Sequence, residues 1–232
     1  KWNIEKAKDN KKTTLLTFGG AFSNHIAAAA HACQENGLKS VGVIRGEKVE
    51  PLNSTLRKAE ENGMQLHFVS REDYNLKKND DFILGLRNQF GNFHLVPEGG
   101  ANYYGVMGCM EITKELDFDP DYLVTSAGTG TTASGLLMTA KQEQKVMVFS
   151  GLKGGGFLEK DIKHLINYTT YNEDHTAEVL RHLVLKTDYH FGGFAKITPE
   201  LIQFVNVFHQ QFQIPLDLIY TSKLFYGLFD GI

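Results

Sequence analysis

The stretch TFGGAFSNHIAAAAHA, from Thr17 to Ala32, joins a short apolar strand to a helix through a glycine pair and three small polar residues. The apolar run TTLLTF that leads into it is typical of a buried strand, and the alanine-rich segment after it is typical of a helix. Ser23, Asn24 and His25 stand together at the junction. A helix needs only one such side chain as its N-terminal cap, so capping does not explain the other two.

The same order of strand and helix recurs along the chain. Strands are expected at residues 13–18, 40–46, 64–70, 93–97, 121–128 and 145–152, and helices at 24–36, 51–63, 81–89, 105–116, 130–142, 154–166, 198–212 and 220–230. This repeated alternation predicts an α/β fold in which mainly parallel sheets are covered by helices. We place a boundary near residues 95–97, between a smaller α/β domain (1–95) that carries the Ser-Asn-His loop and a larger one (96–232).

Composition limits the partners of the protein. The 232 residues are 42% hydrophobic and 22% charged, and the net charge of −3 gives no general attraction to nucleic acid or anionic membranes. No apolar run reaches the length of a membrane span. Cys33 and Cys109 lie far apart in sequence, so we expect free thiols in a reducing cytoplasm. The histidines occur without an HExxH or CxxC context, and no metal site is expected.

A second loop, SAGTGTTASG at residues 126–135, follows one expected strand and opens the next helix. Backbone N–H groups at a helix start, freed from side-chain bulk by glycine, form an anion site. Thr129, Thr131 and Thr132 add hydroxyl donors. Several amides and three hydroxyls suit the three free oxygens of a phosphate monoester.

Two other interpretations of this loop stay open. Residues 128–133 formally fit the GxGxxA form of the dinucleotide fingerprint, but the acidic residue that should follow about 20 residues later is not found in FSGLKGG. The loop could also be a simple glycine turn with a threonine cap. A Walker loop is excluded because no GK[ST] follows.

Taken together with PEGGAN (97–102) and IYTSK (219–223), the two loops give the chain a family resemblance. It resembles the pyridoxal-phosphate-dependent enzymes that group 1-aminocyclopropane-1-carboxylate deaminase with D-cysteine desulfhydrase. The resemblance covers essentially the whole chain, with its motifs in the right order. It implies the tryptophan synthase β-like fold (fold type II), with two three-layer α/β/α domains. It also implies pyridoxal 5'-phosphate as cofactor, a small amino acid as substrate and a homodimer.

The resemblance also implies roles for individual residues. Asn24 would bond the phenolic oxygen of the cofactor and Thr221 its pyridine nitrogen. Ser23 and Tyr220 would be catalytic, and Ser23 would contact the substrate together with His25 and Phe194. The cofactor phosphate would be held by Gly128, Thr129, Gly130, Thr131 and Thr132.

Simpler structural roles remain possible at several of these positions. Ser23 and Asn24 could only cap a helix. Tyr220 could be a core tyrosine with a bonded hydroxyl, and His25 is the residue whose role the sequence defines least.

The sequence departs from the family pattern at three places. The family's catalytic lysine, in a GNK-type motif, would fall about five residues before Lys1, so we expect an upstream segment to complete the larger domain. The ring-opening deaminase has a glutamate where this chain has Thr221, and a tyrosine where it has Phe194. These changes favour β-elimination to an α-keto acid and ammonia, as in D-cysteine desulfhydrase. The alternatives are 1-aminocyclopropane-1-carboxylate deaminase and a non-catalytic relative that binds the cofactor or another small molecule.

Overall fold

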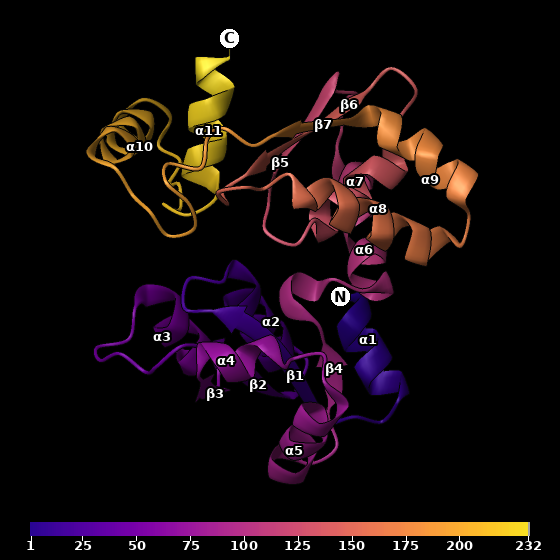
Figure 1. Cartoon of the computed structure of the whole chain (residues 1–232), viewed down its shortest axis with the longest axis vertical. Coiled ribbons are helices and arrows are strands. Elements are labelled where there is room, and N and C mark those ends of the chain that lie inside the picture. Colours follow the sequence, from indigo (N-terminus) through magenta and orange to yellow (C-terminus); the bar gives the residue numbers. More distant parts are fainter. Residues whose placement is uncertain (232) are drawn as a thin grey trace. The chain divides into compact units, whose positions relative to one another are not determined.

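The computed structural model describes residues 1–231 and divides the chain into two compact units, Lys1–Tyr104 and a second unit that begins at Gly105 (Figure 1). Each unit is built on its own parallel sheet. The α/β class with parallel sheets is therefore confirmed. No helix within residues 1–231 is both long enough and apolar enough to cross a membrane.

The first unit contains a sheet of parallel strands in the order β3-β2-β1-β4. Phe18 in the first strand lies beside Val43 in the second, which fixes the register of this pair. All four strands were expected from the sequence. Their bounds are β1 (Thr14–Gly20), β2 (Lys39–Arg45), β3 (Met64–Val69) and β4 (His94–Val96).

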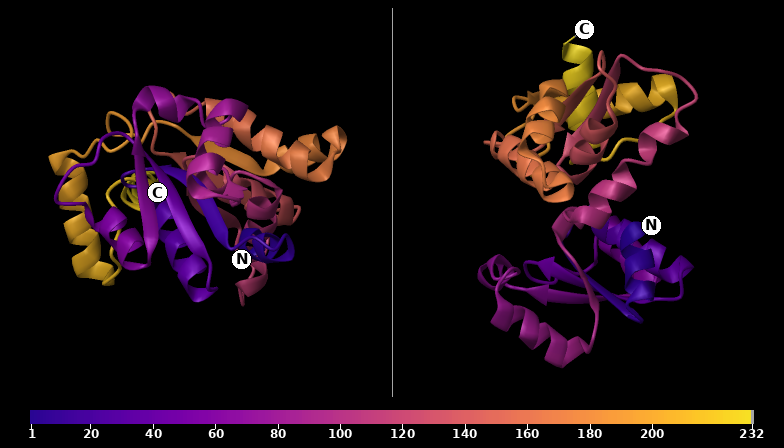
Figure 2. Two further views of the ribbon diagram at one scale, coloured as in Figure 1. Left: turned by 90° about the horizontal axis from the view of Figure 1, so that it is seen from below. Right: turned by 90° about the vertical axis from the view of Figure 1, so that its right-hand side faces the viewer.

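Helices cover both faces of this sheet (Figures 1 and 2). On one face, Ile26 and Leu56 from two helices pack on Ile44 and Met64. On the other face, a cluster of buried residues around Phe18 includes side chains from the later helices. The helices of the unit are α1 (Trp2–Asp9), α2 (Asn24–Glu35), α3 (Ser54–Glu61), α4 (Arg71–Asn75) and α5 (Asp80–Phe90), followed by the short turn η1 (Glu98–Gly100).

The second unit contains parallel strands in the order β5-β6-β7. Helix α6 (Tyr103–Cys109) leads into it, and its strands are β5 (Tyr122–Ala127), β6 (Lys145–Ser150) and β7 (Leu183–Lys186). Its other elements are η2 (Ile112–Glu115), α7 (Thr131–Thr139), α8 (Phe157–Thr170), α9 (Glu173–Val179), η3 (Leu180–His182), α10 (Pro199–Phe212) and α11 (Thr221–Asp230).

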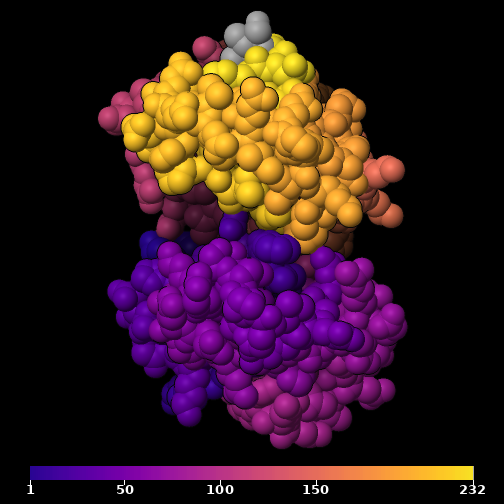
Figure 3. All heavy atoms as spheres, turned by 90° about the vertical axis from the view of Figure 1, so that its left-hand side faces the viewer, coloured from indigo at the N-terminus to yellow at the C-terminus, as the bar shows by residue number. Residues whose placement is uncertain are grey.

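The sheet of the second unit is also packed on both faces. On one face, side chains of α7, α8 and α9 form a core with β5 and β6 that includes Leu137, Ile162 and Val148. On the other face, α11 approaches so closely that a Cβ on Gly227 would lie 2.6 Å from atoms of Phe149 and Tyr189. Part of α10 is visible at the surface of this unit (Figure 3), whereas its residues Leu201 and Phe208 are buried.

Two parts of the second unit differ from the sequence-based expectation. The helix expected at 105–116 ends at Cys109, and the chain continues as the separate turn η2. The Glu111 N–H donates to the Gly108 carbonyl, three residues back, so the regular α-helical bonding is lost at this point. Helix α9 and strand β7 were not expected; β7 has only four residues and none of them is fully buried.

Candidate functional site

In the first unit, the Ser-Asn-His loop follows the carboxyl end of β1 and runs into the first turn of α2, which begins at Asn24. Ser23 is the N-cap of α2, and its hydroxyl accepts a hydrogen bond from the Ile26 N–H at 3.3 Å. Gly19 allows this turn, because a Cβ there would lie 2.4 Å from Ile26 and 2.8 Å from the Ser23 hydroxyl. The Asn53 side chain donates to the Ala21 carbonyl at 2.9 Å and so fixes the loop from α3.

The three polar residues of this loop have different surroundings. Ser23 acts as a cap, as the simpler interpretation allows. Asn24 is the first residue of α2 and is exposed. His25 is partly buried, and its Nε2 lies 2.7 Å from the Thr17 Oγ1.

The hydrogen bonds of Thr17 define the tautomer of His25. The fully buried Thr17 hydroxyl donates to the Val96 carbonyl at 2.9 Å, so it accepts from Nε2–H of His25. Nδ1 of the neutral ring is then an acceptor. Burial lowers the pKa of His25 to about 4, and the Glu98 carboxylate only partly opposes this shift. His25 is therefore neutral at pH 7.

In the second unit, the threonine-rich loop joins β5 to α7. Gly130 is the N-cap of α7 in the left-handed conformation (φ 79°), and no side chain caps the helix at this end. The first N–H groups of a helix have no partner within it, and α7 has no acidic residue in its first turn. A Cβ on Gly130 would lie 2.6 Å from Ile162, so glycine is required for packing as well as for φ.

The threonine hydroxyls gather at this helix start. The hydroxyls of Thr129 and Thr131 are 3.1 Å apart, and Thr132 accepts a weak bond from the Cys109 thiol at 3.8 Å. Uncapped amides, the helix dipole and these hydroxyls together suit a dianionic phosphate. The residues at the start of α7 therefore fit the phosphate of a phosphorylated cofactor.

Tyr220 lies against this loop within the same unit. A Cβ on Gly128 would be 3.5 Å from the Tyr220 hydroxyl, and the ring centroids of Phe194 and Tyr220 are 6.1 Å apart. The chain thus brings three of the expected site residues together, although they lie up to 92 positions apart in sequence.

Asp217 organises the start of α11, where Tyr220 and Thr221 are found. Its carboxylate accepts from the backbone N–H groups of Ile219, Tyr220 and Thr221 at 2.9, 2.7 and 3.0 Å. The Thr221 hydroxyl donates to the same carboxylate at 2.6 Å. Ser222, the next residue, is fully buried, and its hydroxyl has no hydrogen-bond partner within residues 1–231.

Sequence reasoning missed four residues that shape the segments around the site: Thr17, Asn53, Asp217, and Lys223, whose Nζ donates to the carbonyls of His190 and Gly193. Asp217 could have been found, because an aspartate shortly before a helix is a capping signal. Thr17 and Lys223 could not, because their partners are backbone carbonyls far away in sequence.

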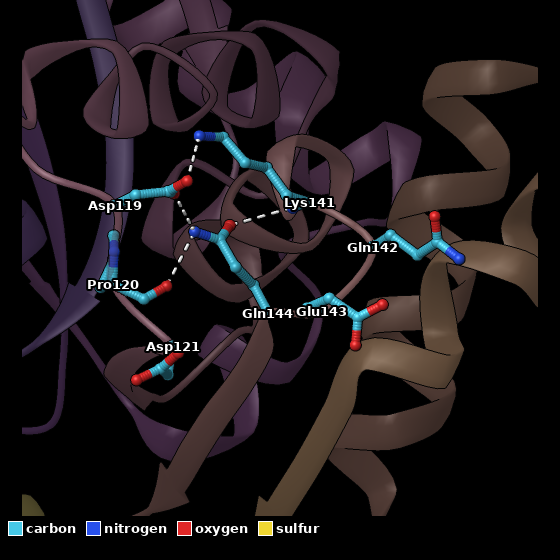
Figure 4. Close-up of a pocket in the computed structure, with 7 residues that line it drawn as sticks. All are labelled: Asp119, Pro120, Asp121, Lys141, Gln142, Glu143 and Gln144. Atoms are coloured by element: carbon cyan, nitrogen blue, oxygen red, sulfur yellow. Dashed lines mark hydrogen bonds and ion pairs between the residues drawn. The ribbon is translucent and has the colours of Figure 1, made fainter.

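A hollow of about 300 Å³ in the second unit is not part of the candidate site, and its lining residues have a structural role (Figure 4). It lies where β5 and β6 begin, whereas the threonine-rich loop follows the carboxyl end of β5. Gln144 donates to Asp119 and to the Pro120 carbonyl, both at 2.8 Å, and Lys141 pairs with Asp119 at 2.7 Å. These bonds tie the two strand entries together. No group of three or more His, Cys, Asp or Glu side chains in the described part of the chain could hold a metal ion.

Comparison with known proteins identifies the class. The family described as pyridoxal-phosphate-dependent enzyme matches residues 1–153, about two thirds of the sequence. The chain belongs to this family, and its cofactor is accordingly pyridoxal 5'-phosphate. The resemblance inferred from the loops is confirmed.

Individual relatives point in the same direction. The chain is 28% identical over 225 residues to a provisionally named 1-aminocyclopropane-1-carboxylate deaminase of Pyrococcus horikoshii, covering 93% of this chain and 68% of that protein. It is 26% identical over 250 residues to the mitochondrial bifunctional D-cysteine desulfhydrase/1-aminocyclopropane-1-carboxylate deaminase of Arabidopsis thaliana, covering 99% and 61%. A crystal structure of an ACC deaminase homologue superposes with a TM-score of 0.81 at 25% identity, covering 98% of this chain and 71% of that one.

Proposed function

We propose that this protein is a lyase that uses pyridoxal phosphate to carry out β-elimination on a small amino acid, in the manner of D-cysteine desulfhydrase. The observation that supports this most directly is the packing of Tyr220 against Gly128. It puts a phenol, which can exchange a proton, next to the loop that fits the cofactor phosphate. The products would be an α-keto acid and ammonia, together with the β-substituent.

The residues at the two loops would divide the work of holding the cofactor. The amides at the start of α7 and the hydroxyls of Thr129, Thr131 and Thr132 would hold the phosphate, while Gly128 and Gly130 keep the backbone close to it. Asn24 would bond the phenolic oxygen and Thr221 the pyridine nitrogen. When bound, the cofactor supplies the electron sink that stabilises negative charge at the substrate α-carbon.

The remaining site residues would act on the substrate. Tyr220 would transfer a proton, and Ser23 would contact the substrate carboxylate or assist that transfer. The neutral His25 and the ring of Phe194 would line the pocket. We assign the cofactor-holding part of this work to a larger domain (residues 96–232) and the Ser-Asn-His loop to a smaller one (1–95).

Two features favour elimination over ring opening. Phe194 has no hydroxyl, so it can stack on a substrate but cannot transfer a proton. Thr221 is neutral, and a neutral hydroxyl stabilises a protonated ring nitrogen less than a carboxylate would. Loss of a thiol from the β-carbon requires less stabilisation of negative charge by the cofactor than opening a cyclopropane ring does.

The Arabidopsis relative is named for both activities, so the alternative of 1-aminocyclopropane-1-carboxylate deaminase is tested beside the main proposal. The purified protein, supplied with pyridoxal phosphate, is assayed for α-keto acid and ammonia with D-cysteine, L-cysteine and 1-aminocyclopropane-1-carboxylate. Faster turnover of D-cysteine supports the proposal, and faster turnover of the cyclopropane substrate supports the deaminase. Cofactor binding without turnover of any of these would indicate a non-catalytic relative.

We further propose that the protein is cytoplasmic and forms a homodimer. The free thiols of Cys33 and Cys109 are compatible with a reducing compartment. Light scattering coupled to size exclusion measures the assembly directly, and a mass of one chain at micromolar concentration would contradict the dimer.

A further inference from the structure

Lys223 is a buried lysine on the first turn of α11 that the proposed chemistry does not use. Only 1% of the residue is exposed. Its Nζ donates to the carbonyls of Gly193 at 2.8 Å and His190 at 2.9 Å, and lies 3.5 Å from the carbonyl of Gly151. Burial lowers the pKa of Lys223, and the Asp217 carboxylate opposes this effect. Burying a lysine is costly, so its carbonyl contacts must compensate.

The segment that Lys223 holds has an unfavourable backbone. Phe191, Gly192, Gly193 and Ala195 all have positive φ, at 51°, 94°, 124° and 57°. Positive φ is costly for residues with a Cβ, so the loop needs contacts from outside to keep this conformation. Two of the three Lys223 carbonyl partners belong to this loop.

The same loop carries Phe194, whose ring lies beside Tyr220. Tyr220 is three residues before Lys223, at the N-cap of α11. Gly151 lies next to both: a Cβ built there would be 3.8 Å from Cδ of Lys223 and 3.9 Å from Cδ1 of Tyr220. One side chain therefore ties the loop of Phe194 to the helix start that carries Tyr220.

We propose that Lys223 is a positioning residue whose ammonium group holds the 190–195 loop, and that it thereby fixes the distance between Phe194 and Tyr220 and the shape of the substrate pocket. The assignment of the pocket rests on the proposed function, whereas the hold on the loop does not. Removal of the ammonium releases the loop, and Phe194 then no longer forms a defined wall.

The hold on the loop is tested by amide hydrogen exchange on the cofactor-free protein. The reporters are the Gly193 N–H, bonded to the His190 carbonyl, and the Lys196 N–H, bonded to the Gly193 carbonyl. In Lys223→Met both are expected to exchange at least about tenfold faster, with little change in the first unit. Lys196→Met is the matched control, because it removes an exposed lysine directly after the loop and leaves the carbonyl contacts of Lys223 intact. Unchanged exchange in Lys223→Met would overturn the proposal.

Lys223→Arg keeps the charge and the donors, and serves as the second variant if Lys223→Met does not fold. Its longer, forked side chain displaces the carbonyls, so faster exchange confined to the loop is expected. Equal acceleration throughout the second unit would show a general packing role and overturn the proposal.

The effect on the pocket is measured with whichever amino acid the wild-type enzyme turns over best. Lys223→Met is expected to raise KM by about fivefold or more while kcat changes less, because a loosened wall removes binding rather than proton transfer. A loosened loop with unchanged KM would overturn the positioning role. If the wild-type protein turns over no amino acid, the proposed function fails, and the exchange experiment still decides whether Lys223 holds the loop.

Discussion

Replacement of Gly130 by alanine tests the structure of the phosphate loop. The new Cβ meets two penalties: φ is 79°, in the left-handed region, and Cγ1 of the fully buried Ile162 lies 2.6 Å away. The left-handed conformation costs an L-residue about 1–2 kcal/mol, and overpacking costs about 1–3 kcal/mol. Gly130→Ala is therefore expected to lower the free energy of unfolding by roughly 2–5 kcal/mol, a large part of the typical total.

The matched control is Gly128→Ala, two residues earlier. Gly128 has ordinary φ, and its Cβ would make only normal contacts with Tyr220 at 3.5 Å or more. We expect its loss of stability to be below about 1 kcal/mol. Urea denaturation of the cofactor-free variants measures both changes, and amide exchange in α7 and α8 assigns them to the second unit. Equal stabilities of the two variants would refute the close packing of the loop on α8.

Three further predictions concern charges and caps. The pKa of His25 is lowered from 6.5 to about 4, so the unfolded chain takes up a proton first, and the free energy of unfolding falls as the pH drops from 6.5 toward 4. Urea denaturation at pH 7 and at pH 4.5 should show that wild type loses about 2–3 kcal/mol more of this free energy than His25→Gln does. Equal losses in the two proteins would contradict the prediction. Burial raises the pKa of the Cys33 thiol to about 11, so Cys33 in the native protein should react with a thiol reagent at neutral pH at least about 100-fold more slowly than a free cysteine peptide; rapid native reaction would count against its burial. Asp217→Ala removes the acceptor of the Ile219, Tyr220 and Thr221 N–H groups at the start of α11 and should lower the free energy of unfolding by roughly 2 kcal/mol. A free energy of unfolding within a few tenths of a kcal/mol of wild type would show that this cap contributes little.

Much of the fold could be predicted because helix caps, glycine turns and buried strands depend on residues that are close together in the sequence. Thr198 is the side-chain cap of α10 and Pro199 is its first residue, and both residue types are common at these positions of a helix. Gly37, expected as the C-terminal cap of the helix that begins at Asn24, has a φ of 67° just after α2. Strands β1 and β2 were recognised because their interiors are buried, and strands buried on both faces form nearly continuous apolar runs.

The features that escaped prediction depend on distant parts of the chain. Strand β7 has only four residues, and none of them is fully buried, so its short apolar run of Leu183, Val184 and Leu185 is a weak strand signal. Nothing in the local sequence around Lys223 distinguishes it from an exposed surface lysine. Its burial depends on carbonyls near residues 151 and 190–193, which only the folded sheet brings to it. The Ser-Asn-His loop was found from its composition, but the tautomer of His25 required the Thr17 hydrogen bonds.

The central claim is that the loop from Gly128 to Thr132 binds the phosphate of the cofactor. The most direct measurement compares the Kd of the protein for pyridoxal phosphate with its Kd for pyridoxal, which lacks the phosphate. We predict that the wild-type protein prefers pyridoxal phosphate by at least about 100-fold. Thr129→Val should reduce this preference about tenfold, whereas Thr139→Val, at the other end of α7, should leave it unchanged. Equal affinity of the wild-type protein for the two compounds would contradict the account.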